Sequence, residues 1–279
     1  MNRRTAQGTT LALLASVQWG ATGIWVALLR DLPTGTTLVF RFLTAALLLA
    51  ALLAITRGYK APTRQAAYAG ALLAAYYILA TIGFYLSNVV SVSLLVSTSP
   101  FFVMLLRALR RERVAPRELA GGLLAFVGVT VVLMLGDQST GTGESELIGN
   151  LCGLGAALTM ALYSVAGTRL QGQGWSVVLI SCVLGLLVCV PFAPGAEAMP
   201  DRHQWALFLG LAAFSTLAPG YLYPLACQHI TPTAATTVRL STPFFTALFA
   251  FWVLGEALGI NHLLGAPLML VGVYLTLPR

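Results

Sequence analysis

Charged residues are scarce in this sequence, and acidic residues are the scarcest of them. Only 9% of the 279 residues are Asp, Glu, Lys or Arg, against about 25% in a typical soluble domain. Hydrophobic residues make up 58% of the chain, and the mean hydropathy is +0.84. This composition excludes an ordinary soluble domain and indicates an all-α integral membrane protein.

Cysteine and histidine are also few, which excludes several kinds of site. The four cysteines fall in apolar runs without a Cys-x-x-Cys pair, and the three histidines lie at the ends of expected spans. We therefore expect neither disulfides nor a metal site, and no cofactor. A membrane-embedded enzyme is the alternative from another functional class, but it would need an acidic metal cluster or a Ser/His nucleophile pair at membrane depth. The sequence offers neither, so we expect no enzyme.

Apolar runs predict ten membrane-spanning helices, since one span needs about 20 apolar residues. An acidic stretch rich in Gly, Ser and Thr at 137–146 is the expected linker between a first half, 1–136, and a second half, 147–279. The expected spans cover residues 8–29, 34–55, 65–86, 89–109, 118–135, 147–170, 175–192, 204–226, 231–254 and 260–277.

The placement of positive charge predicts the orientation of the chain. With the N-terminus in the cytoplasm, twelve of the 16 Lys and Arg residues fall on the cytoplasmic side, and seven of the nine acids fall outside. We therefore expect a multi-pass protein of the plasma (inner) membrane with both termini cytoplasmic. The basic cluster 107–117 is expected to set this topology and to face anionic lipid, and no nucleic-acid partner is expected.

One short motif occurs twice, at matching positions of the two halves. Ser97-Thr98-Ser99-Pro100-Phe101-Phe102 is followed 143 residues later by Leu240-Ser241-Thr242-Pro243-Phe244-Phe245, and Glu112 is matched by Glu256 144 residues on. Because each half has an odd number of spans, the second half must insert upside down, which predicts two five-helix inverted repeats. A proline inside a span leaves a backbone carbonyl without its helical partner, so Pro100, Pro219 and Pro243 are expected helix breaks.

These motifs, in this order, resemble the drug/metabolite transporter superfamily, and within it the EamA-like family. The resemblance covers the whole chain and rests on the two five-span halves, on Trp19-Gly20 in the first span, and on Arg41-Phe42 in the second. It implies a central cavity lined by spans 1, 3, 4, 6, 8 and 9, and export of small metabolites, with aromatic amino-acid exporters nearest. In one departure, Met160-Ala161 stands in the second half where the first half has Trp19-Gly20.

Polar and aromatic side chains within the spans are the candidates for substrate contact, because a polar group at this depth must face a cavity or another helix. An aromatic cavity with a few hydroxyls suits a ligand with an apolar body and a polar or zwitterionic end. Interhelical hydrogen bonding is the alternative for each Ser and Thr, and a place in an interfacial aromatic belt is the alternative for the aromatic residues. The expected substrate-binding residues are Gln18, Trp19, Thr22, Tyr77, Thr81, Tyr85, Thr98, Thr159, Tyr163, Tyr221, Arg239 and Ser241.

Two arginines lie inside spans, while no acidic residue lies in the interior of one. Arg239 is expected either to bind a substrate carboxylate or to be capped by carbonyls and extend to the cytoplasmic side. Arg41 is expected to snorkel or to brace backbone, with a role in substrate binding as the alternative. Without an acid at membrane depth we expect a uniporter; a proton-coupled metabolite or drug exporter of the same fold is the alternative. The expected partners are a small-molecule substrate and the lipid bilayer, and the sequence leaves the oligomeric state open, compatible with a monomer.

Overall fold

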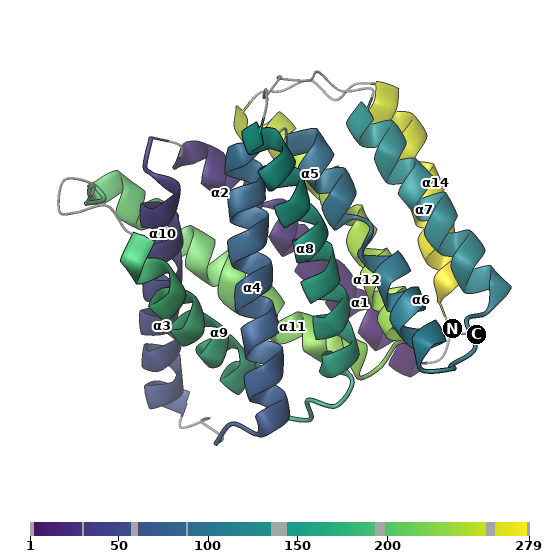
Figure 1. Ribbon diagram of the computed structural model, residues 1–279, viewed down its shortest axis with the longest axis horizontal. Helices are drawn as coiled ribbons and strands as arrows, with labels where there is room; N and C mark the ends of the chain where they lie inside the picture. Colours follow the sequence, from purple (N-terminus) through teal and green to yellow (C-terminus); the bar gives the residue numbers. More distant parts are fainter. Residues whose placement is uncertain are drawn as a thin grey trace.

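The computed structural model describes residues 3–29, 31–56, 61–87, 89–134, 144–192, 199–254 and 260–277, and every element within them is helical (Figure 1). Several spans are continuous helices: α3 (Thr34–Thr56), α4 (Arg64–Leu86), α7 (Pro116–Met134), α8 (Glu144–Gly167) and α14 (Ile260–Thr276). α9 (Gly174–Cys189) is extended by a short 3₁₀ turn, η1 (Val190–Phe192). Most of the expected linker 137–146 lies outside the described residues.

The other spans are interrupted. Span 1 is divided into α1 (Arg3–Gly20) and α2 (Thr22–Leu28), and span 4 into α5 (Val89–Val96) and α6 (Ser99–Leu109). Span 8 consists of α10 (Arg202–Ala212), a π-helical turn η3 (Ala213–Leu217) and α11 (Ala218–Cys227). Span 9 consists of α12 (Pro232–Val238), a 3₁₀ turn η4 (Arg239–Ser241), α13 (Thr242–Phe249) and a π-helical turn η5 (Ala250–Leu254).

These elements form ten helical columns in the described chain, which confirms the predicted fold class. Five helices are by themselves long and apolar enough to cross a membrane, and the longest stretch that satisfies this criterion is the whole of span 8, 202–227. Spans 4 and 9 are divided by their breaks into helices of at most 11 residues.

The last helices of the two halves, α7 and α14, pack against each other along one edge of the bundle (Figure 1). Gly121 of α7 faces Gly272 of α14, so that a Cβ atom on Gly121 would lie 2.7 Å from the Gly272 carbonyl oxygen. Gly121 and Gly128 are matched by Gly265 and Gly272 at the 144-residue offset of the repeat, and small residues let membrane helices approach closely. The repeat thus produces a direct contact between equivalent helices.

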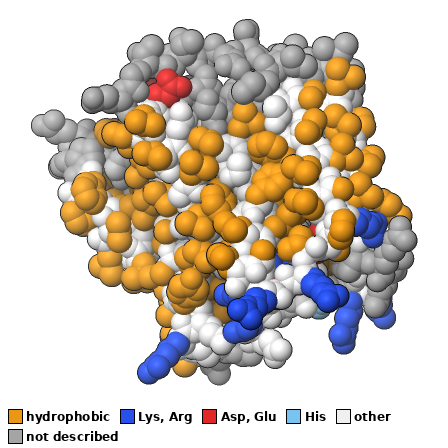
Figure 2. Space-filling model, turned by 45° about the vertical axis from the view of Figure 1, so that its right-hand side comes forward, with side chains coloured by type: hydrophobic (Ala, Val, Ile, Leu, Met, Phe, Trp, Pro, Cys, Tyr) orange, Lys and Arg blue, Asp and Glu red, His pale blue; other side chains and the backbone are white. Residues whose placement is uncertain are grey.

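The surface has the layering expected of a membrane protein. Figure 2 shows hydrophobic side chains over the middle of one face and Lys and Arg side chains gathered at its lower edge. Both chain ends lie at that same end of the bundle (Figure 1). We call this end the basic face and define it by the start of α1 at Arg3, the start of α4 at Arg64 and the end of α6 beside Arg110.

We predict that Gly121→Ala destabilises the protein by about 1–3 kcal/mol, because the new methyl group meets backbone that cannot move aside. The measurement is thermal unfolding of the purified protein in detergent. Gly122→Ala is the matched control, since its methyl group would meet only the flexible end of Met104. Equal melting temperatures for the two variants would contradict this account of the α7–α14 contact.

Candidate functional site

The prolines of span 8 decide which backbone carbonyls are left without a helical partner. Proline has no N–H group, so Pro219 cannot bond the carbonyl of Ser215 four residues earlier, and Pro224 cannot bond that of Gly220. Buried side chains from other spans supply the missing donors. Arg41 of α3 donates through Nη2 to the Ser215 oxygen at 3.1 Å.

Tyr163 of α8 does the same for the second proline, donating its hydroxyl to the Gly220 oxygen at 2.9 Å. Both freed carbonyls of span 8 are therefore satisfied inside the bundle by side chains from different halves of the chain. This pairing meets the requirement that backbone polar groups in a bilayer find partners within the protein.

Arg41 braces the backbone of η3. Its Nε donates to Thr216 Oγ1 at 3.0 Å, its Nη1 lies 3.5 Å from Thr81 Oγ1, and its guanidinium carbon lies 4.2 Å from the centre of the Tyr77 ring. The residue is only 2% exposed. Of the alternatives that the sequence left for Arg41, these contacts agree with bracing of the backbone.

Arg239 lies at the break in span 9, within the turn η4. Its guanidinium carbon is 4.7 Å from the Trp19 ring centre and 4.8 Å from the Tyr76 ring centre, and Nη2 donates to the Tyr76 hydroxyl. The residue is 6% exposed, and its Nε has no hydrogen-bond partner. The charge is therefore held between aromatic faces, with one donor still available.

Trp19 and Tyr76 contact this guanidinium, and rings from two further spans pack against them; we call Trp19, Tyr76, Tyr77, Tyr163 and Tyr223 the aromatic cluster. The Trp19 ring lies 6.0 Å from that of Tyr76 and 5.3 Å from that of Tyr223, which stacks with Tyr163 at 6.1 Å. Trp19 Nε1 donates to the Tyr77 hydroxyl at 3.3 Å, and that hydroxyl donates to the Thr216 carbonyl oxygen at 3.1 Å. The rings are thus fixed in place by hydrogen bonds at their polar ends.

Several buried polar atoms near the interrupted helices have no hydrogen-bond partner. On span 1 these are Gln18 Oε1, Thr22 Oγ1 and Trp25 Nε1, which recur at helical spacing; on span 9 they are Arg239 Nε and Thr242 Oγ1. The two spans are in contact here: the Thr246 hydroxyl of α13 donates to the Gly20 carbonyl oxygen at 3.0 Å. Leaving a buried polar atom unpaired costs about 1–3 kcal/mol, so such atoms point to a water or a ligand.

The structure brings together part of the predicted residue set. Trp19, Tyr77, Tyr163 and Arg239 lie in or against the aromatic cluster, and Thr81 joins it through Arg41. Gln18 and Thr22 present unpartnered atoms at the end of α1 and the start of α2.

The remaining predicted residues have other partners. Tyr221 stacks on Trp175 at 4.0 Å, and Tyr85 shares a hydrogen bond with Thr37. The hydroxyls of three residues bond to carbonyls of their own span rather than to another helix: Thr98 to Leu95, Thr159 to Gly155 and Ser241 to Val238.

The substrate-binding residues predicted from the sequence include neither Tyr76 nor Tyr223. Tyr76 stands beside Tyr77 in the chain, and both face the bundle interior although neighbouring residues of a helix point about 100° apart. Tyr223 is fully buried and pairs with Ser164 at 2.9 Å, whereas Tyr221 was the residue predicted from the same stretch. Pro224, which directly follows Tyr223, was the feature of the sequence that could have pointed to Tyr223.

The prolines predicted as helix breaks follow the interruptions directly. Pro100 lies in the first turn of α6, Pro219 in the first turn of α11 and Pro243 in the first turn of α13. In span 9 the carbonyl of Arg239, four residues before Pro243, instead accepts from the Thr242 N–H. A hinge function of these positions stays a prediction.

Comparison with known proteins gives the family. The EamA-like transporter family matches residues 6–134 and, a second time, residues 147–277. The chain belongs to the EamA-like transporter family. It is therefore a multi-pass membrane transporter rather than an enzyme, and the two matches correspond to its duplicated halves.

Similar proteins agree with this assignment. An uncharacterized transporter of Archaeoglobus fulgidus is 26% identical, the alignment covering 99% of this chain and 98% of that protein. The uncharacterized transporter YetK of Bacillus subtilis is 22% identical over 96% of this chain and 85% of its own. A solved structure, titled only as the crystal structure of a protein, has a TM-score of 0.81 at 18% identity, covering 97% of this chain and 96% of that one.

We predict that Tyr163→Phe lowers stability by about 1–3 kcal/mol, because the Gly220 carbonyl loses its donor. The same change in a Pro224→Ala background should be milder, since the alanine introduced there has an N–H group that can bond this carbonyl. Thermal unfolding of the two single variants and of the double variant gives the coupling energy. Additive effects would mean that Pro224 and Tyr163 do not act on the same carbonyl.

Proposed function

We propose that this EamA-family transporter exports small amphipathic metabolites that carry a carboxylate, with aromatic and large apolar amino acids as the principal candidates. The observation that supports this most directly is Arg239: a buried guanidinium between aromatic faces, with an unpartnered Nε. A carboxylate suits a guanidinium better than any neutral acceptor does, and a ring or aliphatic chain suits the aromatic cluster.

The unpartnered atoms of Gln18, Thr22 and Thr242 give a second polar region for the other end of such a substrate. An amide oxygen and hydroxyls accept hydrogen bonds from an ammonium group, so a zwitterion has complementary partners at both ends. Discontinuous helices at the middle of the membrane are the usual position for such a site in transporters built from inverted repeats.

The proposed cycle is alternating access between two halves, residues 1–136 and 147–279, in the plasma membrane with the basic face in the cytoplasm. Uniport is the proposed mode, because the sequence has no Asp or Glu in the interior of an expected span that could carry a coupling proton. Among the described residues, no three His, Cys, Asp or Glu side chains lie close enough together to hold a metal ion.

The first test is uptake of a labelled amino-acid panel into proteoliposomes, with and without an imposed pH gradient. We expect saturable uptake of aromatic or large apolar amino acids at the same rate in both conditions. Uptake that requires the gradient would indicate the proton-coupled exporter instead, and no uptake of any member would refute the proposed substrate class.

A second test addresses Arg239. We predict that Arg239→Gln raises KM for phenylalanine about 10–100-fold, the loss expected for a hydrogen bond to a charged group. Phenylalaninamide, which lacks the carboxylate, should be affected far less. Arg239→Lys is the matched control that keeps the charge. An equal loss for both compounds would show that Arg239 supports structure rather than carboxylate recognition.

A further inference from the structure

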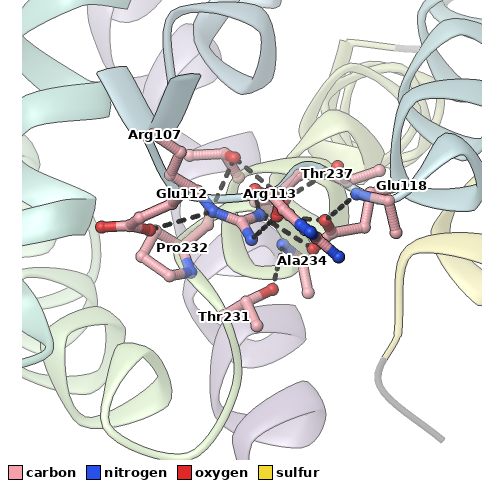
Figure 3. Close-up of polar contacts among 11 residues, drawn as sticks. Arg107, Glu112, Arg113, Glu118, Thr231, Pro232, Ala234 and Thr237 are labelled. Carbon is pink, nitrogen blue, oxygen red and sulfur yellow. Dashed lines mark hydrogen bonds and ion pairs between the residues drawn. The ribbon is translucent and has the colours of Figure 1, made fainter. Parts of the chain in front are cut away.

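A network of ion pairs and hydrogen bonds lies at the basic face (Figure 3). At its centre is Arg107, in the last turn of α6. Its Nη1 lies 2.9 Å from Glu118 Oε1 and 3.0 Å from Oε2, and its Nε lies 3.4 Å from Glu112. We call Arg107, Glu112, Glu118 and Thr233 the Arg107 network.

Most of this network is local to the connection between α6 and α7. Arg107 Nη2 donates to the Arg113 carbonyl at 3.0 Å, and Glu118 Oε2 accepts from the Ala115 N–H at 3.1 Å. Glu118 is in the first turn of α7, where the positive end of the helix dipole favours a carboxylate. These groups, which all belong to the first half, hold the guanidinium in one position.

One bond of the network reaches the second half of the chain. Arg107 Nη1 also donates to Thr233 Oγ1 of α12 at 2.9 Å, and Thr233 is fully buried. The other hydroxyls of α12 bond within their own helix: Thr236 to the Pro232 and Thr233 carbonyls, and Thr237 to the Thr233 carbonyl. Figure 3 shows Arg107 directed at the start of α12 from the α6 side.

The repeat reproduces only part of this network. Glu112 is matched by Glu256, but shifting Arg107 and Glu118 by the same 144-residue offset gives Phe251 and His262, which cannot form an arginine–carboxylate pair. The repeated sequence therefore provides the Arg107–Glu118 pair at the basic face without a counterpart in the second half.

We propose that Arg107 is a gating residue for transport: its bond to Thr233 holds the basic face closed, and that bond must break before this face opens. The inference rests on the alternating-access cycle proposed above. In such a cycle α6 and α12, which belong to different halves and pack together here, must separate at this face. The Arg107–Thr233 bond is a charge-assisted link across that boundary.

α12 leads directly into η4 and Arg239, so movement of its first turn is transmitted to the break in span 9. Arg107 thus positions the start of the same short helix that carries the candidate substrate-binding arginine at its end. Substrate loading from the basic face and the opening of this bond are consequently parts of one movement.

The test measures access to α12 from each side of the membrane. Thr237→Cys, introduced in a background with the four native cysteines changed to Ala, places a thiol one turn deeper than Thr233 on the same side of the helix. A membrane-impermeant maleimide is applied to one face of oriented vesicles at a time. Thr233→Val, which removes the bond, should increase labelling from the basic face about tenfold, the effect of losing one hydrogen bond to a charged group.

Thr236→Val is the matched control, because its hydroxyl is equally buried but bonds only within α12, and it should leave labelling unchanged. Arg107→Gln should increase labelling as Thr233→Val does, and combining the two should add nothing further. Unchanged labelling in Thr233→Val, or strictly additive effects, would overturn the gating assignment.

The outcome is separable from that of the proposed function. If the parent protein is labelled and transports, but Thr233→Val leaves both unchanged, only the gating role fails. If the reporter cysteine is never labelled from the basic face in any variant and no substrate is transported, alternating access itself is wrong and the gating role fails with it. Faster labelling from both faces equally would indicate local unfolding, which also refutes a gate.

Discussion

The need to satisfy every backbone polar group inside the bilayer accounts for much of this structure. Pro219 and Pro224 each leave a carbonyl of span 8 without an N–H partner, and lipid cannot supply one. Arg41 and Tyr163 supply the donors from spans 2 and 6. Removing a charge or a hydroxyl at these positions would expose a bare carbonyl, so the interruptions and their partners depend on one another.

Two buried arginines in the same bundle differ in how far their hydrogen-bonding groups are satisfied. The hydrogen-bonding capacity of Arg41 is taken up by η3 and Thr81, with Tyr77 stacked against its plane. Arg239 has aromatic faces and one hydroxyl, and retains an unpartnered donor. Burial alone does not identify a binding residue; unsatisfied capacity at a helix break is the more informative property.

The inverted repeat is closely followed in some places and broken in others. Gly121 and Gly272 pack together because the same small-residue pattern occurs in both last helices. The Arg107–Glu118 pair has no equivalent in the second half, and Met160 stands at the position that matches Trp19. The two halves therefore share their helix packing at α7 and α14 and differ in these polar and aromatic groups.

The sequence by itself determined the helical class, the ten spans, the repeat and the importance of Trp19, Tyr77 and Arg239 as buried polar or aromatic groups. Those features depend on composition, hydrophobic length and spacing along one helix. Only the tertiary structure decided that Tyr223 rather than Tyr221 joins the cluster, that Tyr76 holds Arg239, and that Arg107 reaches Thr233. Such choices depend on the rotation of each helix about its own axis, which packing fixes between residues more than one hundred positions apart.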